Sequence, residues 1–204
     1  MGKVVLDMSM SLDGFITGPN PTREHGLGTG KGEYLHHWLF SGNEASHYSE
    51  FFKAEGASRA VVDEMLTQTG SMVVGRKLYD LVDGWGGSHP IPGMVIFVVT
   101  HDPPKDVPVG GSTFIFVTDG VENAIRQAKA AAGNKQVLMH GASMAQQALK
   151  EGVLDEMLIH LVPILLGDGV CLFDHAQDGQ MELECTRLIE APGVTHMRYK
   201  VKNP

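Results

Sequence analysis

The chain has 204 residues, of which 43% are hydrophobic and 20% charged, as is typical of a globular domain with a well-buried core. Its formal charge of −8, with only 16 basic residues scattered along the sequence, argues against a nucleic-acid binder, because neutralising phosphates needs clustered Lys and Arg. We therefore expect a single domain over residues 1–204 that binds a small molecule and no nucleic acid.

Neither the cysteines nor the hydropathy pattern indicates secretion or a membrane. Cys171 and Cys185 form no Cys-x-x-Cys pair, and two cysteines are too few for a disulfide framework. The apolar runs are much shorter than the roughly 20 residues that span a bilayer, and the N-terminus leads into a strand without a charged leader. We therefore expect a cytoplasmic protein that does not bind membranes.

Strand and helix patterns alternate over the first three quarters of the chain. Short runs rich in Val, Ile and Leu predict strands, and apolar spacing of three and four residues predicts helices. Residues 18–32 carry five glycines and two prolines, so we expect a long surface loop there. In chain order, we expect strands over residues 3–10, 71–75, 94–100, 113–118 and 137–139, and helices over 33–40, 44–55, 59–69 and 121–132, from Arg76 and from Ala142.

The pattern changes after Gly152, beyond which no helix is predicted. Strands separated by short turns are expected over residues 156–166, 170–173, 181–189 and 195–201. The chain thus passes from β/α alternation into an antiparallel ending. This order predicts the α/β class, with a mixed, mainly parallel sheet that has an antiparallel C-terminal end and helices on both faces.

Three predicted strand ends carry groups that suit an anion. They are Gly75-Arg76-Lys77, Thr100-His101 and His140-Gly141-Ala142-Ser143. In open α/β sheets, ligands bind outside the carboxyl ends of the strands, and the free N–H groups of a helix N-terminus attract phosphate. Each turn taken alone is more typical of an ordinary solvated loop. Taken together, the three suggest a site for a dinucleotide with an extra phosphate.

Several blocks of the sequence follow one another in an order known from one superfamily. They are Ser11-Leu12-Asp13-Gly14, Val74-Gly75-Arg76-Lys77, Val99-Thr100-His101, Gly141, Gly152-Val153-Leu154-Asp155-Glu156, Pro163-Ile164-Leu165-Leu166-Gly167-Asp168-Gly169 and Leu172-Phe173. With these blocks the chain resembles the dihydrofolate-reductase-like superfamily, most closely the C-terminal reductase domain of the bifunctional riboflavin-biosynthesis deaminase/reductase. The resemblance implies a dihydrofolate-reductase-like three-layer fold, NADPH as cofactor and hydride transfer to a heterocycle.

The resemblance also implies which residues hold NADPH. Those expected at the pyrophosphate and the adenosine 2′-phosphate are Gly75, Arg76, Lys77, Thr100, His101, Gly141, Ala142, Ser143 and Met144, and those beside the nicotinamide are Ser9 and Ile16. Three positions depart from the family pattern. Leu78 replaces a hydroxyl residue, His101 stands where arginine is common, and Ala142 replaces a second glycine. Backbone donors should preserve cofactor binding, whereas the preference for NADPH over NADH depends on these side chains.

The implied activity is that of a reductase acting on a pyrimidine- or pterin-like ring. It is similar to 5-amino-6-(5-phosphoribosylamino)uracil reductase of riboflavin biosynthesis, with a dihydrofolate-reductase-like activity on another small substrate as the alternative. We predict that Asp13 is catalytic and relays a proton, and that Trp38 and His160 bind the substrate. The structural alternatives are that Asp13 closes its turn, Trp38 belongs to the core and His160 is satisfied within the sheet.

Two other classes of function remain open on the sequence. The stretch Gly141-Ala142-Ser143-Met144-Ala145 nearly matches the nucleophile elbow of a serine hydrolase, with Ser143 as nucleophile. It lacks the final glycine, and the antiparallel ending does not fit that fold. The partners that follow in hydrolase order are Asp155 or Asp174 and His175 or His196. The third class is a non-catalytic protein that binds NADPH.

The histidines do not indicate a metal site. His36 and His37 are adjacent, so their side chains point to different faces. The signature of zinc deaminases, His-x-Glu with Pro-Cys-x-x-Cys, is absent from the sequence. We therefore predict no metal.

The last strands indicate how copies of the chain assemble. Residues 157–201 contain long apolar strands, and the helices of one copy are too few to cover them completely. Exposed apolar patches of a few hundred Å² usually mark an interface. We expect a two-fold homodimer in which the strands from Leu158 onward pack across the axis, as the resemblance also implies.

Overall fold

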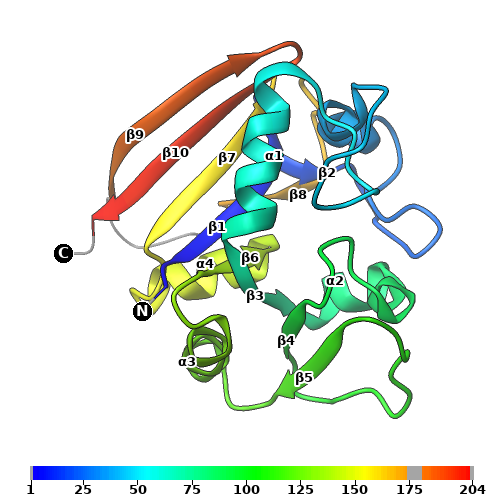
Figure 1. Cartoon of the computed structure of the whole chain (residues 1–204), viewed down its shortest axis with the longest axis vertical. Helices are drawn as coiled ribbons and strands as arrows, with labels where there is room; N and C mark the ends of the chain where they lie inside the picture. The colour runs from blue at the N-terminus through cyan, green and yellow to red at the C-terminus, as the bar shows by residue number, and fades with distance from the viewer. Residues whose placement is uncertain (1, 174–180, 203–204) are drawn as a thin grey trace.

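The computed structural model describes residues 2–173 and 181–202, which form an α/β fold around one large sheet (Figure 1). This sheet has eight strands in the order β5-β4-β3-β6-β1-β7-β10-β9, and β2 and β8 form a small second sheet. The strands are β1 (Val4–Ser11), β2 (Phe15–Thr17), β3 (Thr69–Gly75), β4 (Val95–Val99), β5 (Thr113–Val117), β6 (Gln136–His140), β7 (Glu156–Val162), β8 (Val170–Cys171), β9 (Glu182–Ala191) and β10 (Val194–Lys202).

Strand direction divides the large sheet into two parts. The strands from β5 to β7 in that order pair in parallel, whereas β10 is antiparallel to both β7 and β9. This arrangement confirms the predicted mixed, mainly parallel sheet with its antiparallel C-terminal end. Because β1 lies between β6 and β7, residues far apart in the sequence meet along its whole length.

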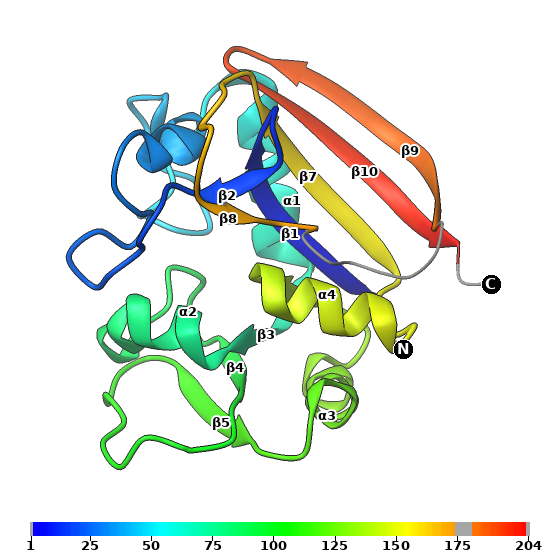
Figure 2. The same cartoon turned by 180° about the vertical axis from the view of Figure 1, so that it is seen from behind.

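Helices cover both faces of the sheet (Figures 1 and 2). The 3-10 helix η1, α1 and α2 pack on one face, and α3 and α4 pack on the other. The helices are η1 (Gly32–Phe40), α1 (Gly56–Gln68), α2 (Arg76–Leu81), η2 (Asp83–Gly87), α3 (Val121–Ala132) and α4 (Ala142–Lys150). Within the described ranges, none is long and apolar enough to cross a bilayer.

The alternation of side chains along β1 gives the two faces different characters. Leu6 and Met8 belong to the apolar core under α3 and α4, where burial of each such side chain contributes about 1.5–3 kcal/mol. Asp7 and Ser9, one residue away, point to the opposite face, towards η1 and α1. The alternation along β1 therefore places the polar side chains of Asp7 and Ser9 together on the face that carries η1 and α1.

Two predicted elements differ from the observed ones. Residues 44–55, predicted as a helix, form bends and one isolated bridge between Ser46 and Ser49. Both serine hydroxyls accept hydrogen bonds from the backbone N–H two residues later, a local arrangement that competes with helix formation. The strand predicted over 156–166 ends at Val162, because Pro163 has no N–H to donate to a ladder.

Candidate functional site

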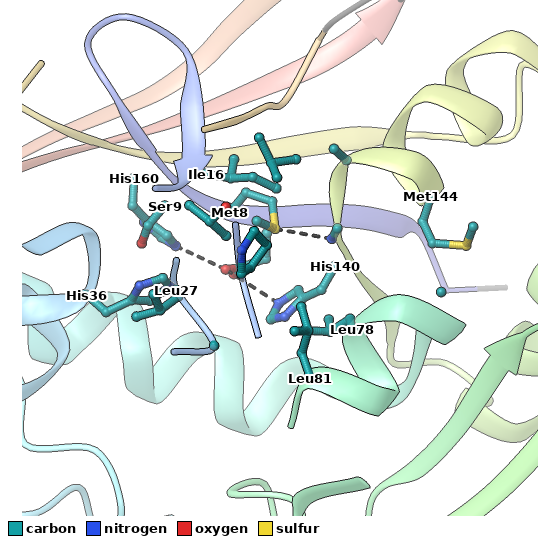
Figure 3. A pocket seen from close by; sticks show the side chains of 18 of the residues that line it. Met8, Ser9, Ile16, Leu27, His36, Leu78, Leu81, His140, Met144 and His160 are labelled. Carbon is teal, nitrogen blue, oxygen red and sulfur yellow. Dashed lines mark hydrogen bonds and ion pairs between the residues drawn. The ribbon is translucent and has the colours of Figure 1, made fainter. Parts of the chain in front are cut away.

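A cavity of about 620 Å³ opens at the carboxyl ends of β1, β3 and β6 (Figure 3). Its walls come from these strand ends, from the loop over residues 21–27, from η1 and α1, and from the first turns of α2 and α4. The volume lies within the range of ligand pockets in proteins. The two ends of the cavity differ in chemistry.

One end is made by two glycine turns that each precede a helix. Gly141 has a φ of 98° and ends β6 directly before α4, a conformation that favours glycine. No side chain caps the N-terminus of α4, so the first N–H groups of this helix are available to a ligand. Gly75 lies opposite, where an added Cβ would stand 3.5 Å from Met144. Lys77 lines the same end and adds a positive charge.

The other end is a polar wall on the face of the sheet that carries η1. Oδ1 of Asp7 lies 3.2 Å from Nε2 of His160 and 3.9 Å from Nε2 of His140. The Trp38 ring packs against His160, with their centroids 4.5 Å apart. His36 completes this wall. Nδ1 of His36 and Nε2 of His140 are buried without a hydrogen-bond partner among the described residues.

The electrostatics of this wall follow from burial and from the neighbouring rings. Burial raises the pKa of Asp7, but attraction and a hydrogen bond from His160, with the fields of His140 and His196, outweigh burial and lower the pKa overall. Burial lowers the pKa of His140, and burial with the field of His140 lowers the pKa of His36 to about 4. At neutral pH the wall therefore presents the carboxylate of Asp7 and the neutral imidazoles of His36 and His140.

Most of the residues predicted for the site line this cavity. They are Ser9, Ile16, Trp38, Gly75, Lys77, Gly141, Ala142, Ser143, Met144 and His160. The residues predicted for the site that are not part of the lining are Asp13, Arg76, Thr100 and His101.

Asp13 holds a turn together. Its carboxylate accepts hydrogen bonds from the Ser11 hydroxyl at 2.6 Å and from the N–H groups of Leu166 and Gly167 at 3.1 and 2.7 Å. The Ser11 bond is the main reason for its lowered pKa, and the two N–H groups add to the effect. Catalysis by Asp13 stays a prediction, and the carboxylate that lines the cavity is Asp7.

The other three residues cluster at the edge next to Lys77. The guanidinium of Arg76 pairs with Asp80 at 2.8 Å and donates to the carbonyl of Asp102. Thr100 is hydrogen-bonded to the same residue, Asp102, and His101 is exposed. Arg76, Thr100 and His101 therefore lie together, beside the glycine turn of β3.

The arrangement required of a serine hydrolase does not form among the described residues. Ser143 Oγ accepts a hydrogen bond of 2.9 Å from Gln147. Asp155 accepts one from the N–H of Val4, and His196 is bonded to Ser58 and His160. Asp174 and His175 lie outside the described residues. The described part of the chain also holds no group of His, Cys, Asp and Glu side chains that could bind a metal.

Sequence reasoning did not assign Asp7, His36 or His140 to the cavity, although it named His140 as part of one anion-binding strand end. The signal for Asp7 is an acidic residue inside the apolar strand Val4–Ser11. His140 directly precedes the glycine turn that was singled out as an anion site.

One protein family matches nearly the whole chain. The model of the RibD C-terminal domain matches residues 2–196. The uncharacterized protein YwjB of Bacillus subtilis (strain 168) is 25% identical over 173 residues, which are 84% of this chain and 82% of that protein. A putative riboflavin biosynthesis protein from Shewanella sp. PV-4 superposes with a TM-score of 0.69 at 22% identity, with all of both chains covered.

The dihydrofolate reductase of Enterococcus faecalis, solved with NADP(H), superposes with a TM-score of 0.54 at 10% identity. The match covers 99% of this chain and 98% of that enzyme. At this level of identity the similarity concerns the fold, which is therefore that of dihydrofolate reductase, as predicted.

Proposed function

Because the chain belongs to the RibD C-terminal domain family, a family of reductases, we propose that it is an NADPH-dependent reductase that transfers hydride to a pyrimidine- or pterin-like ring. The observation that carries this proposal is one cavity of about 620 Å³ with two unlike ends. One end offers backbone N–H groups and a lysine, which suit a pyrophosphate. The other offers a carboxylate, imidazoles and an indole, which suit a flat polar ring.

The residues of the first end fit a dinucleotide. The uncapped N-terminus of α4 and the glycine at its start allow close approach of phosphate oxygens. Arg76 and His101 lie at the outer edge, where the adenosine 2′-phosphate would be held. When bound, NADPH supplies the hydride, and Ser9 and Ile16 would flank its nicotinamide.

The polar wall would orient the substrate. The ionised Asp7 would accept hydrogen bonds from ring N–H or amino groups, and His36 and His140 line the same wall beside it. Trp38 provides an aromatic surface beside them. The gain in rate would come mainly from holding the ring next to the nicotinamide at a productive distance and angle.

The cofactor end is tested with two matched glycine variants. Gly141 lines the cavity and Gly193 lies in the turn between β9 and β10; both have positive φ and open space around a new Cβ. Gly141→Ala and Gly193→Ala should each cost about 1–2 kcal/mol of folding stability. Only Gly141→Ala should weaken NADPH binding, by about tenfold or more in a fluorescence titration.

The reaction is tested by following NADPH oxidation with a panel of aminopyrimidines, uracils and pterins, each with and without a phosphoribosyl group. The expected result is oxidation with at least one ring class and a rise in melting temperature with NADPH. Absence of any NADPH binding by the wild-type protein would overturn the proposal.

A further inference from the structure

The polar wall of the cavity continues into the interior of the protein. Nε2 of His160 lies 3.2 Å from Oδ1 of Asp7, and its Nδ1 lies 2.7 Å from Nδ1 of His196. Nε2 of His196 in turn lies 3.0 Å from the hydroxyl of Ser58, in the first turn of α1. His160, His196 and Ser58 are 3%, 1% and 3% exposed. The four residues form an unbroken buried chain from the cavity to α1.

Strand register explains why these residues meet. His160 on β7 is directly opposite His196 on β10, so both rings lie on one face. Ser9 is the register partner of His160 on β1, which places Asp7 two residues away on that same face. The chain therefore crosses three adjacent strands at one level of the sheet.

The hydrogen bonds that join Ser58, His196, His160 and Asp7 can all be assigned the same direction. The ionised Asp7 can only accept, so Nε2–H of His160 donates to it. In its Nε2–H tautomer, which the relay requires, His160 accepts at Nδ1, and this acceptor is matched by Nδ1–H on His196. Nε2 of His196 accepts from the Ser58 hydroxyl. Every hydrogen thus points towards Asp7, and each group can pass one proton forward as it receives another.

The far end of the chain reaches a second cavity. His196 lines a space of about 20 Å³ together with Glu64, Gln136, Arg187 and Arg198. This volume suffices for about one water molecule, and the lining offers the polar partners that a buried water needs. His196 thus separates the large cavity from a small polar cavity under β9 and β10.

The charged groups around Asp7 and His196 allow His196 to carry an extra proton for a short time. Asp7 faces His160 on β7, His140 on β6 and His196 on β10. His196 faces His160, Asp7 and Arg187 on β9, and burial with the field of His160 lowers its pKa to about 4. His196 is therefore neutral at neutral pH and holds an extra proton only during transfer.

We propose that Ser58, His196, His160 and Asp7 form a proton relay from the α1 end of the chain to the ring reduced in the large cavity. The relay rests on the reductase activity proposed above. Hydride forms the new C–H bond, and the electron pair of the ring C=N moves to nitrogen. Asp7 receives a proton from Nε2 of His160 and passes a proton to that ring nitrogen. His160 takes a proton at Nδ1 from His196, His196 takes one at Nε2 from the Ser58 hydroxyl, and Ser58 takes one from water, which is left as hydroxide. In this scheme Asp7 is catalytic, and His160 and His196 act through it.

The relay is tested with His196→Asn. The new amide N–H can still donate to His160 but cannot pass a proton on. We expect kcat to fall about tenfold or more with KM and the NADPH dissociation constant unchanged, together with a larger solvent isotope effect. His89→Asn is the matched control, because His89 is a histidine hydrogen-bonded to Ile91 outside the cavity; its kcat should equal that of the wild type. An unchanged kcat in His196→Asn would overturn the relay.

A second measurement does not depend on activity. Nitrogen NMR of the imidazoles at neutral pH should show the Nε2–H tautomer for His160 and the Nδ1–H tautomer for His196. The opposite tautomers, or two cationic rings, would overturn the relay whatever the activity. A protein with the expected tautomers that oxidises no NADPH would contradict the proposed function and leave the directed chain supported.

Discussion

The indole N–H of Trp38 donates a hydrogen bond of 3.0 Å to the hydroxyl of Ser9. The bond ties η1 to the central strand β1, and both residues are buried while lining the cavity. The sequence predicted separate roles for them, Ser9 beside the nicotinamide and Trp38 beside the substrate. Because the two side chains are bonded, the residue expected beside the nicotinamide and the residue expected beside the substrate are fixed relative to each other.

The first prediction concerns the stability of that pair. Trp38→Phe and Ser9→Ala each leave one buried polar group unpaired, which should lower the free energy of unfolding by about 1–3 kcal/mol each. The double variant removes both partners, so its loss should be smaller than the sum of the two single losses. Urea unfolding measures all four proteins. Strictly additive losses would show that the hydrogen bond contributes nothing.

The second prediction is that NADPH binds about tenfold or more tightly than NADH, because a charge-assisted bond to the 2′-phosphate is worth about 1.5–3 kcal/mol. Arg76→Ala and His101→Ala should each reduce this preference while NADH affinity stays constant. Lys105→Ala serves as the control, because Lys105 is an exposed basic residue of the loop that carries His101. Equal dissociation constants for the two dinucleotides in the wild type would refute the assignment.

The third prediction separates a reductase from a hydrolase. Ser143 is bonded to Gln147 and lies in the first turn of α4, so its hydroxyl would add only one contact to those of the backbone. Ser143→Ala should weaken NADPH only modestly and leave any background ester hydrolysis unchanged. An esterase activity that disappears in this variant would favour the hydrolase.

The fourth prediction concerns stability at acid pH. The pKa of His196 falls from 6.5 in the unfolded chain to about 4 in the folded protein, so the unfolded state binds more protons between these values. Stability is full above about pH 6.5 and falls as the pH approaches 4, by at most roughly 3 kcal/mol from this residue. The decrease of the urea midpoint across this range should be smaller in His196→Asn and unchanged in His47→Asn, which alters an exposed histidine. Equal slopes in the two variants would contradict the assignment to His196.

The sequence predicted those parts of the fold that depend on local pattern. The Val-rich strand β4 and the alanine-rich helix α3 follow from apolar spacing alone, and the glycine turn at Gly141 follows from a strand that stops before a helix. The region 44–55 was predicted wrongly, because serine hydroxyls bond to nearby backbone there. In that region a side-chain interaction outweighed helical spacing.

Trp38 and His160 of the polar wall were predicted, but the contacts within the wall were not, because they depend on register between distant strands. Asp7 and His160 are on neighbouring strands β1 and β7, whose pairing cannot be read from either segment alone. His196 was considered only as a hydrolase partner, since nothing local indicates that β10 returns beside β7. The glycine turns at Gly75 and Gly141 could be predicted from the sequence, because each is formed within a few residues.

The edge strand β9 leaves apolar side chains exposed on the face opposite α1, which has the features of an interface. Met197, Tyr199 and Val201 on β10 alternate with residues that face α1; Val201 is buried, and the other two are partly buried against the core under α3 and α4. Leu188 and Leu183 on β9 are the register partners of Met197 and Val201. These two leucines are 56% and 42% exposed. Within the described part of the chain, the helices that pack on this region cover the opposite face (Figures 1 and 2).

We therefore propose the two-fold homodimer expected from the sequence, with β7, β9 and β10 against the axis. Light scattering at micromolar concentration should give twice the chain mass of 22.1 kDa, because burying such an apolar face is favourable at about 25 cal/mol per Å². Leu188→Glu should yield monomers, since each copy would bring a charge into the interface. Val109→Glu, at an exposed residue of the loop before β5, should leave the dimer intact. A monomer mass for the wild type, or a crystal structure whose largest contact avoids these strands, would rule out this assembly.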